Sequence, residues 1–128
     1  MKNLLLLFFL SLTTFGYAQV YVGQVDINKR YIQYIEVWEK PVDNSNRFYA
    51  MVDYGQVDNG KEDKAGINLT ISNMKGARME FNGIVDVLNY MYRNGWQVMN
   101  VKSIDGYESY IMHRREGFVM PTGGMSKN

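Results

Sequence analysis

The amino-acid sequence predicts an α+β fold: a mostly antiparallel sheet of four to five strands with one amphipathic helix packed on one face. Two observations lead to this class. Short runs of aromatic and β-branched residues alternate with turn residues along most of the chain, which is typical of antiparallel strands. One segment, at residues 82–95, has apolar residues at helical spacing. A single helix buries its apolar side against a sheet, so the expected order is β-β-β-α-β-β.

The first two strands are expected to form a hairpin. Residues 31–38 and 48–54 are rich in tyrosine, tryptophan and β-branched side chains, which favour strands. Between them, residues 43–46 (Asp-Asn-Ser-Asn) are typical turn residues. Two strands joined by so short a connection are expected to pair antiparallel.

A third strand is expected at residues 67–71, where apolar and polar side chains alternate. The polar loop before it contains Asn59-Gly60, a pair that favours a tight turn. After it, Lys75-Gly76 predicts a turn before a short extended piece at 78–81.

The helix is expected to begin at Asn82 as N-cap and to end at Gly95, which can take the left-handed conformation. Trp96 follows at the position that commonly packs back on the last helical turn, so we expect it to be buried over Met91. The expected apolar face consists of Ile84, Leu88 and Met91, widened by Val85 and Tyr92. The residues expected to be structural are Asn82, Leu88, Met91, Gly95 and Trp96.

Two further strands are expected after the helix. Residues 96–101 and 107–114 carry strand-forming side chains, and Asp105-Gly106 between them predicts a hairpin turn. This hairpin completes the predicted sheet.

The chain begins with the features of a secretory signal. A lysine precedes an apolar run at residues 4–12, and residues 16–18 (Gly-Tyr-Ala) place small side chains where a signal peptidase reads them. We expect residues 1–18 to be removed by cleavage between Ala18 and Gln19. The apolar run is shorter than the roughly 20 residues that span a bilayer, so no transmembrane anchor is expected after processing. The predicted location is the periplasm or the outside of the cell.

Composition narrows the classes of function. Cleavage leaves one domain at 19–120 and a flexible tail at 121–128, about 110 residues, enough for a core without disulfides. The 14 basic and 13 acidic residues give a net charge of +1 and form no basic cluster, so no nucleic-acid partner is expected. The chain has no cysteine, one histidine (His113) and no phosphate-binding glycine motif. We therefore expect no catalytic residue, no metal site and no cofactor.

Two motifs resemble those of a known group of proteins. The segment Phe81-Asn82-Gly83-Ile84-Val85-Asp86-Val87-Leu88-Asn89-Tyr90-Met91, followed by Gly95-Trp96, and the upstream Asp53-Tyr54-Gly55-Gln56 are similar to marks of short exported proteins of Gram-negative bacteria whose function is not known. A looser likeness is to small domains of unknown function with a helix, a Gly-Trp pair and two strands. The resemblance implies a fold and an export route, and it carries no active site.

The aromatic residues have the most functional promise. The chain has 10 tyrosines and 2 tryptophans, residues favoured on binding surfaces because they combine large contact area with a polar tip. The candidate binding surface consists of Tyr34, Trp38, Tyr49, Tyr54 and Tyr110. The alternative is that these side chains form cross-strand pairs that support the sheet.

The leading hypothesis is a non-enzymatic binding or interaction module of the cell envelope, with an unidentified protein or glycan partner. One alternative is a small envelope hydrolase that uses Glu36 and Asp53, expected on neighbouring strands, as paired carboxylates. Another is a structural domain that forms a homodimer through a sheet edge. Aromatic residues gathered on the face away from the helix would favour binding, and a pocket holding both carboxylates would favour catalysis.

Overall fold

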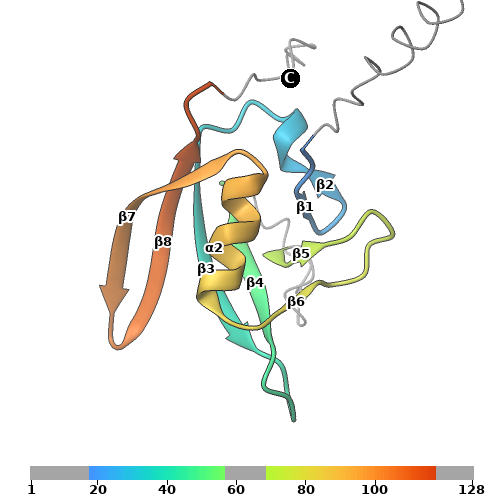
Figure 1. Cartoon of the computed structure of the whole chain (residues 1–128), viewed down its shortest axis with the longest axis vertical. Coiled ribbons are helices and arrows are strands. Elements are labelled where there is room, and N and C mark those ends of the chain that lie inside the picture. The colour runs from blue at the N-terminus through green and yellow to red at the C-terminus, as the bar shows by residue number, and fades with distance from the viewer. Residues whose placement is uncertain (1–17, 57–68, 118–128) are drawn as a thin grey trace, which may run out of the picture.

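The computed structural model describes residues 18–56 and 69–117, which form two antiparallel sheets and one α-helix (Figure 1). The larger sheet has five strands in the order β6-β4-β3-β8-β7, and the smaller has three in the order β2-β1-β5. The predicted α+β class is confirmed. The elements are β1 (Tyr21–Val22), β2 (Val25–Asp26), β3 (Tyr34–Pro41), β4 (Phe48–Asp53), β5 (Ile71–Ser72), β6 (Glu80–Phe81), α2 (Ile84–Arg93), β7 (Trp96–Ile104) and β8 (Tyr107–Arg114).

Both predicted hairpins are present in the larger sheet. β3 pairs antiparallel with β4, although β3 begins and ends three residues later than the predicted 31–38. β7 pairs with β8 and contains an irregularity at Met99 that acts as a β-bulge. The β7–β8 turn consists of Asp105 (φ 52°) and Gly106 (φ 81°), the left-handed pair that a two-residue hairpin turn requires.

The smaller sheet differs from the prediction. β1, β2 and a short 3-10 helix (Ile27–Lys29) precede the first expected strand and were not predicted. Of the strand predicted at 67–71, residues 67–68 lie outside the described residues, and in the described part β5 begins only at Ile71 and has two residues. Thr70 forms an isolated bridge with Met51 of β4, which joins the two sheets. The expected turn at Asn59-Gly60 lies outside the described residues, as do most of the expected leader and the tail at 121–128.

The start of α2 corrects one prediction. The N-cap is Gly83 rather than Asn82. Asn82 Oδ1 instead accepts a hydrogen bond from Arg47 Nη1 at 2.5 Å, and the Asn82 backbone N–H donates to Asp86 Oδ2 at 3.0 Å. The Asn82 side chain therefore ties the helix start to the β3–β4 hairpin and does not cap the helix.

The buried side of α2 is also turned slightly from the predicted one. Met91 is fully buried as one member of this side, and Val87, which the prediction left out, is the other fully buried residue. Ile84 and Leu88 pack against the core from the margins of this side. Val85 and Tyr92 do not widen the apolar face, since they are 67% and 50% exposed.

Trp96 lies at the centre of the core, directly after the helix. Gly95 has a φ of 92° and turns the chain from α2 into β7. The Trp96 side chain is fully buried in the same core cluster as Met91. Its Nε1 donates to Asn28 Oδ1 at 2.8 Å, and the Arg114 guanidinium lies over its ring at 4.4 Å. Both faces and the polar edge of the indole are therefore occupied by protein groups.

Asn28 connects distant parts of the chain through one buried side chain. Its Nδ2 donates to the carbonyls of Ala18 and Asn94, each at 3.0 Å. Its Oδ1 accepts from Trp96 and, at 3.3 Å, from Arg114 Nη1. All four of its hydrogen-bonding positions are filled, as a buried amide requires.

Arg114 completes this network. Its guanidinium donates to the carbonyls of Ile27, Arg30 and Ile32 at 3.0–3.1 Å. Burial lowers the pKa of Arg114, and nearby Asp26 acts in the opposite direction. The last strand is thus fastened to the N-terminal segment, which fixes the position of the β7–β8 hairpin.

Candidate functional site

The larger sheet has two different faces. Side chains alternate along a strand, so Ile35, Val37 and Glu39 of β3 point toward α2 while Tyr34, Glu36 and Trp38 point away. We call the side away from α2 the open face. The strand pairing extends the same division across β4, β7 and β8.

The five aromatic residues of the candidate binding surface do not share one face. Tyr34, Trp38 and Tyr49 lie on the open face, where Tyr34 is 61% exposed and Arg78 lies over the Tyr49 ring at 4.4 Å. Tyr54 and Tyr110 lie on the helix side and pack against the core. The structure therefore divides this set into an open-face group of three and two residues at the core.

Glu36 and Asp53 are direct cross-strand neighbours on β3 and β4. Glu36 is already paired, because its Oε1 accepts from Ser109 Oγ at 2.6 Å and lies 3.0 Å from Lys102 Nζ. The Ser109 hydrogen bond, followed by Lys102, lowers the pKa of Glu36. A cavity of about 240 Å³ beside Glu36 and Trp38 does not include Asp53 in its lining. The two carboxylates are adjacent but do not share this cavity.

His113 also lies on the open face. It pairs across the sheet with Tyr34, and neither residue belongs to a metal-binding group. Within residues 18–56 and 69–117, no three His, Cys, Asp or Glu side chains come together in a way that could hold a metal ion.

The Glu36 pair gives a prediction about pH. Glu36→Gln is expected to lower the free energy of unfolding at pH 7 by less than about 1 kcal/mol, because the ion pair is partly exposed. Since the folded-state pKa is lowered, this stabilisation is present above the ordinary glutamate pKa and is lost as the pH falls through the lowered value. Urea denaturation of both proteins across acidic pH measures the difference. Glu116→Gln, at an exposed position, is the control. If the parent and Glu36→Gln still differ in free energy of unfolding at the lowest pH, the stabilising role of the Glu36 carboxylate is contradicted.

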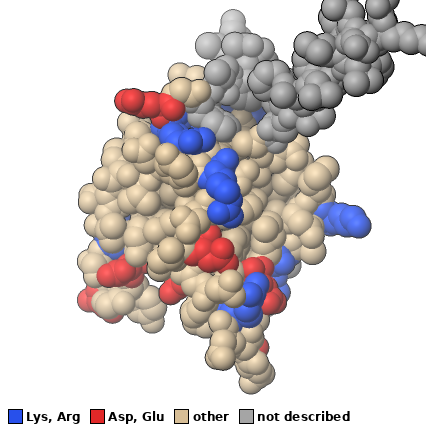
Figure 2. All heavy atoms as spheres, viewed as in Figure 1, with Lys and Arg blue, Asp and Glu red and all other residues tan. Residues whose placement is uncertain are grey.

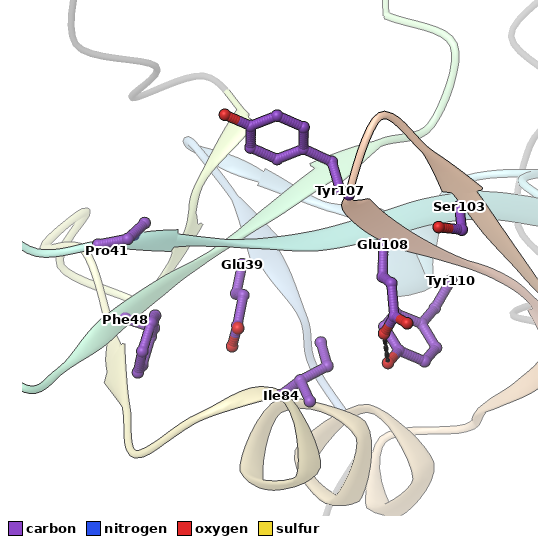
Figure 3. Close-up of a pocket in the computed structure, with 9 residues that line it drawn as sticks. Glu39, Pro41, Phe48, Ile84, Ser103, Tyr107, Glu108 and Tyr110 are labelled. Atoms are coloured by element: carbon purple, nitrogen blue, oxygen red, sulfur yellow. Dashed lines mark hydrogen bonds between the residues drawn. The ribbon is translucent and has the colours of Figure 1, made fainter.

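The largest hollow among the cavities we describe lies on the helix side, under the tip of the β7–β8 hairpin (Figure 3). It measures about 400 Å³, within the range of small-ligand pockets. The end of β3, the start of β4, the first turn of α2 and the β7–β8 hairpin form its walls. We call it the hairpin cleft, and it is lined by Glu39, Pro41, Phe48, Ile84, Ser103, Gly106, Tyr107, Glu108 and Tyr110.

Two carboxylates and a phenol give the hairpin cleft its chemistry. Figure 3 shows Glu39, Glu108 and Tyr110 directed toward the space beside Ile84. Glu39 Oε2 is buried and has no hydrogen-bond partner among the described residues. The Tyr110 hydroxyl donates to Glu108 Oε2 at 3.1 Å. Burial raises the pKa of Tyr110, and the Glu108 hydrogen bond and the Glu39 charge raise it further, so the phenol stays protonated at neutral pH.

Of the residues that line this cleft, Tyr110 is the one that the sequence placed in the candidate binding surface. Glu39 gave a usable signal, because it occupies the next helix-facing position after Ile35 and Val37 on β3. A charged residue in the phase of a buried apolar row marks either the end of the core or a site. This signal can be interpreted only once it is known which face of β3 the helix α2 covers.

Comparison with known proteins adds no further constraint. No protein-family model, curated protein or solved structure matches this chain. On the face that carries α2, acidic and basic side chains are interspersed without a continuous basic patch (Figure 2). No helix within the described residues has the length and apolar character needed to cross a membrane.

Proposed function

We propose that this protein is an exported, non-enzymatic binding module of the cell envelope, and that the hairpin cleft is its ligand site. Export is supported by the secretory pattern at residues 1–18 and by the resemblance of the Asn-Tyr-Met and Gly-Trp motifs to exported proteins. Intact-mass measurement of protein recovered from the periplasm, expected to begin at Gln19, tests this part.

The observation that carries the binding site is the unpaired Glu39 Oε2. A buried polar atom without a partner costs about 1–3 kcal/mol, more if it is charged, and natural proteins rarely leave one in place. Glu39 lines a cleft of about 400 Å³, which could admit a ligand donor beside this carboxylate. Ligand binding would supply the missing hydrogen bond.

The open face is a weaker candidate for the site. Its central carboxylate, Glu36, already has Ser109 and Lys102 as partners, so this group does not need a ligand. The same pairing disfavours the hydrolase alternative, because a general acid needs a raised pKa and that of Glu36 is lowered. The aromatic residues of the open face fit the alternative role, in which they form cross-strand pairs that support the sheet.

The self-association alternative concerns β7, the outer strand of the larger sheet. Val98, Met99, Val101 and Ile104 are 36–57% exposed on it, which favours a contact surface. Two features oppose strand pairing there. The bulge at Met99 interrupts the ladder, and Asn100 Oδ1 accepts the Val101 backbone N–H at 2.9 Å. We therefore favour ligand binding over a dimer formed through this edge.

Chemical-shift mapping of the ¹⁵N-labelled protein tests the site. A panel of cationic, neutral and anionic small molecules, with soluble glycans beside it, is added to the full mature chain. At least one class is expected to shift the amides of Glu39, Ile84 and Tyr110. Tyr110→Phe should weaken that response several-fold, and the matched open-face variant Tyr34→Phe should not. Shifts centred on Tyr34 and Trp38, or none at the cleft with any probe, would overturn the assignment.

A further inference from the structure

The charges in the wall of the hairpin cleft restrict its ligand. Among its nine lining residues the charged ones are Glu39 and Glu108. Neither forms an ion pair with another residue of the described part of the chain. Two carboxylates without a countercharge repel anions and attract cations, since complementary potentials decide which ligands approach.

The nearby helix end does not supply the missing positive charge. Ile84, in the first turn of α2, lines the cleft, and the start of a helix carries a partial positive charge. Asp86 lies in the same turn and accepts the Asn82 backbone N–H. The helix end thus has its own carboxylate, and Glu39 and Glu108 remain without a partner.

The hydrogen-bonding groups of the cleft narrow the cation further. An ammonium group has three donors and no acceptor. The carboxylates of Glu39 and Glu108 and the Tyr110 oxygen line the cleft as acceptors, because the Tyr110 hydroxyl already donates its own proton to Glu108. Charge-assisted hydrogen bonds of this kind are about twice as strong as neutral ones.

The rest of the wall is apolar. Phe48, Ile84 and Pro41 bring hydrocarbon surface to the cleft on the helix side, and Tyr107, which is 83% exposed, stands at the hairpin tip (Figure 3). Such a wall suits an alkyl chain behind the charged group. It does not suit a hydrated metal ion, which takes six or more oxygen ligands.

We propose that the hairpin cleft binds a primary alkylammonium group, with the nitrogen at Glu39 and Glu108 and the alkyl chain against Phe48 and Ile84. A lysine side chain of a polypeptide and a free diamine both present this group. The inference rests on the proposed function, because it assigns a ligand class to the same cleft.

The test compares n-hexylamine with n-hexanol, which has the same alkyl chain and no charge. NMR titration of the full mature chain at pH 7 gives the two dissociation constants. Hexylammonium is expected to bind about tenfold more tightly, the difference between a charge-assisted and a neutral hydrogen bond. Glu39→Gln should abolish this preference while leaving hexanol binding unchanged. Asp53→Asn is the control: it removes a carboxylate of β4 that lines neither this cleft nor the cavity beside Glu36, and it should leave both constants unchanged.

The outcomes separate the inference from the proposed function. If the two probes bind equally well and Glu39→Gln changes neither dissociation constant, the ammonium assignment is overturned, while the cleft remains a binding site. Tighter binding of Ca²⁺ or Mg²⁺ than of hexylammonium at the same residues would also overturn it. No response of cleft residues to either probe would remove the proposed site itself. If the ammonium preference is observed, N-acetyl-lysine methylamide and cadaverine are titrated in parallel. Tighter binding of the first identifies a lysine side chain as the ligand, and tighter binding of the second identifies a free diamine.

Discussion

Trp96→Ala is expected to lower the free energy of unfolding by about 3–5 kcal/mol, the cost of removing a large buried aromatic side chain and leaving a cavity. Trp96 is fully buried, and its ring is covered by Arg114. Removal of the indole also leaves Asn28 Oδ1 with one donor fewer. A loss of this size is a large share of the roughly 5–15 kcal/mol that stabilises a typical domain.

Urea denaturation monitored by circular dichroism measures this effect. Trp96→Phe separates the contributions, because it keeps an aromatic ring under Arg114 but removes the Nε1 donor; a smaller loss is expected. Val85→Ala, at a position 67% exposed on α2, is the control and should change stability by less than about 0.5 kcal/mol. If Trp96→Ala unfolds at the same denaturant concentration as the parent, the placement of Trp96 in the core at the junction between α2 and β7 is wrong.

Asn28→Leu is expected to lower the free energy of unfolding by about 2–4 kcal/mol, although leucine matches the shape of asparagine. The substitution leaves Trp96 Nε1 without its acceptor and Asn94 O without the Asn28 donor, and each buried unpaired group costs about 1–3 kcal/mol. Arg114 keeps three carbonyl acceptors, so the loss of its hydrogen bond to Asn28 contributes less to the destabilisation. The effect arises from unmet polar groups and not from lost volume.

Denaturation of Asn28→Leu beside Asn89→Leu measures this cost, because Asn89 is exposed on α2 and the same substitution should be nearly neutral there. Loss of Asn28 should also increase amide hydrogen exchange in the 3-10 helix at Ile27–Lys29, which the network holds against Arg114. Equal stability of the two variants would show that the Asn28 network contributes nothing to folding.

The parts of the fold that are visible in the sequence depend on local signals. β4, β7 and β8 have alternating or strand-forming side chains, and the Asp105-Gly106 turn needs only its own backbone conformation. The N-terminal strands β1 and β2 have two residues each, too few to show a period. They are held by contacts far apart in sequence, such as Asn28 with Asn94, which no local pattern reveals.

The helix errors have the same origin. Asn82 is a good N-cap by residue type, but Arg47 of the preceding hairpin engages its side chain. Val85 looks apolar enough to be buried, yet the sheet that α2 contacts lies on the side of Val87 and Met91. Tertiary contacts therefore set both the first residue and the rotation of the helix.

The hairpin cleft illustrates why sites are harder to predict than strands. Glu39 and Glu108 are 69 positions apart in sequence and meet only because β8 lies beside β3 in the sheet. Local signals, namely the alternation of side chains and the turn residues, identify each strand but not this meeting point. The cleft also depends on the register of the β7–β8 hairpin, which the Met99 bulge shifts by one residue.

The most direct test of the cleft as an ammonium site is an isotope-filtered NOE experiment on the protein with bound hexylamine. Contacts are expected from the methylene next to the nitrogen to the Glu39 side chain, and from the far end of the alkyl chain to Ile84 or Phe48. Contacts from that methylene to Trp38 and Tyr34 on the open face, with none to Glu39, would contradict the account.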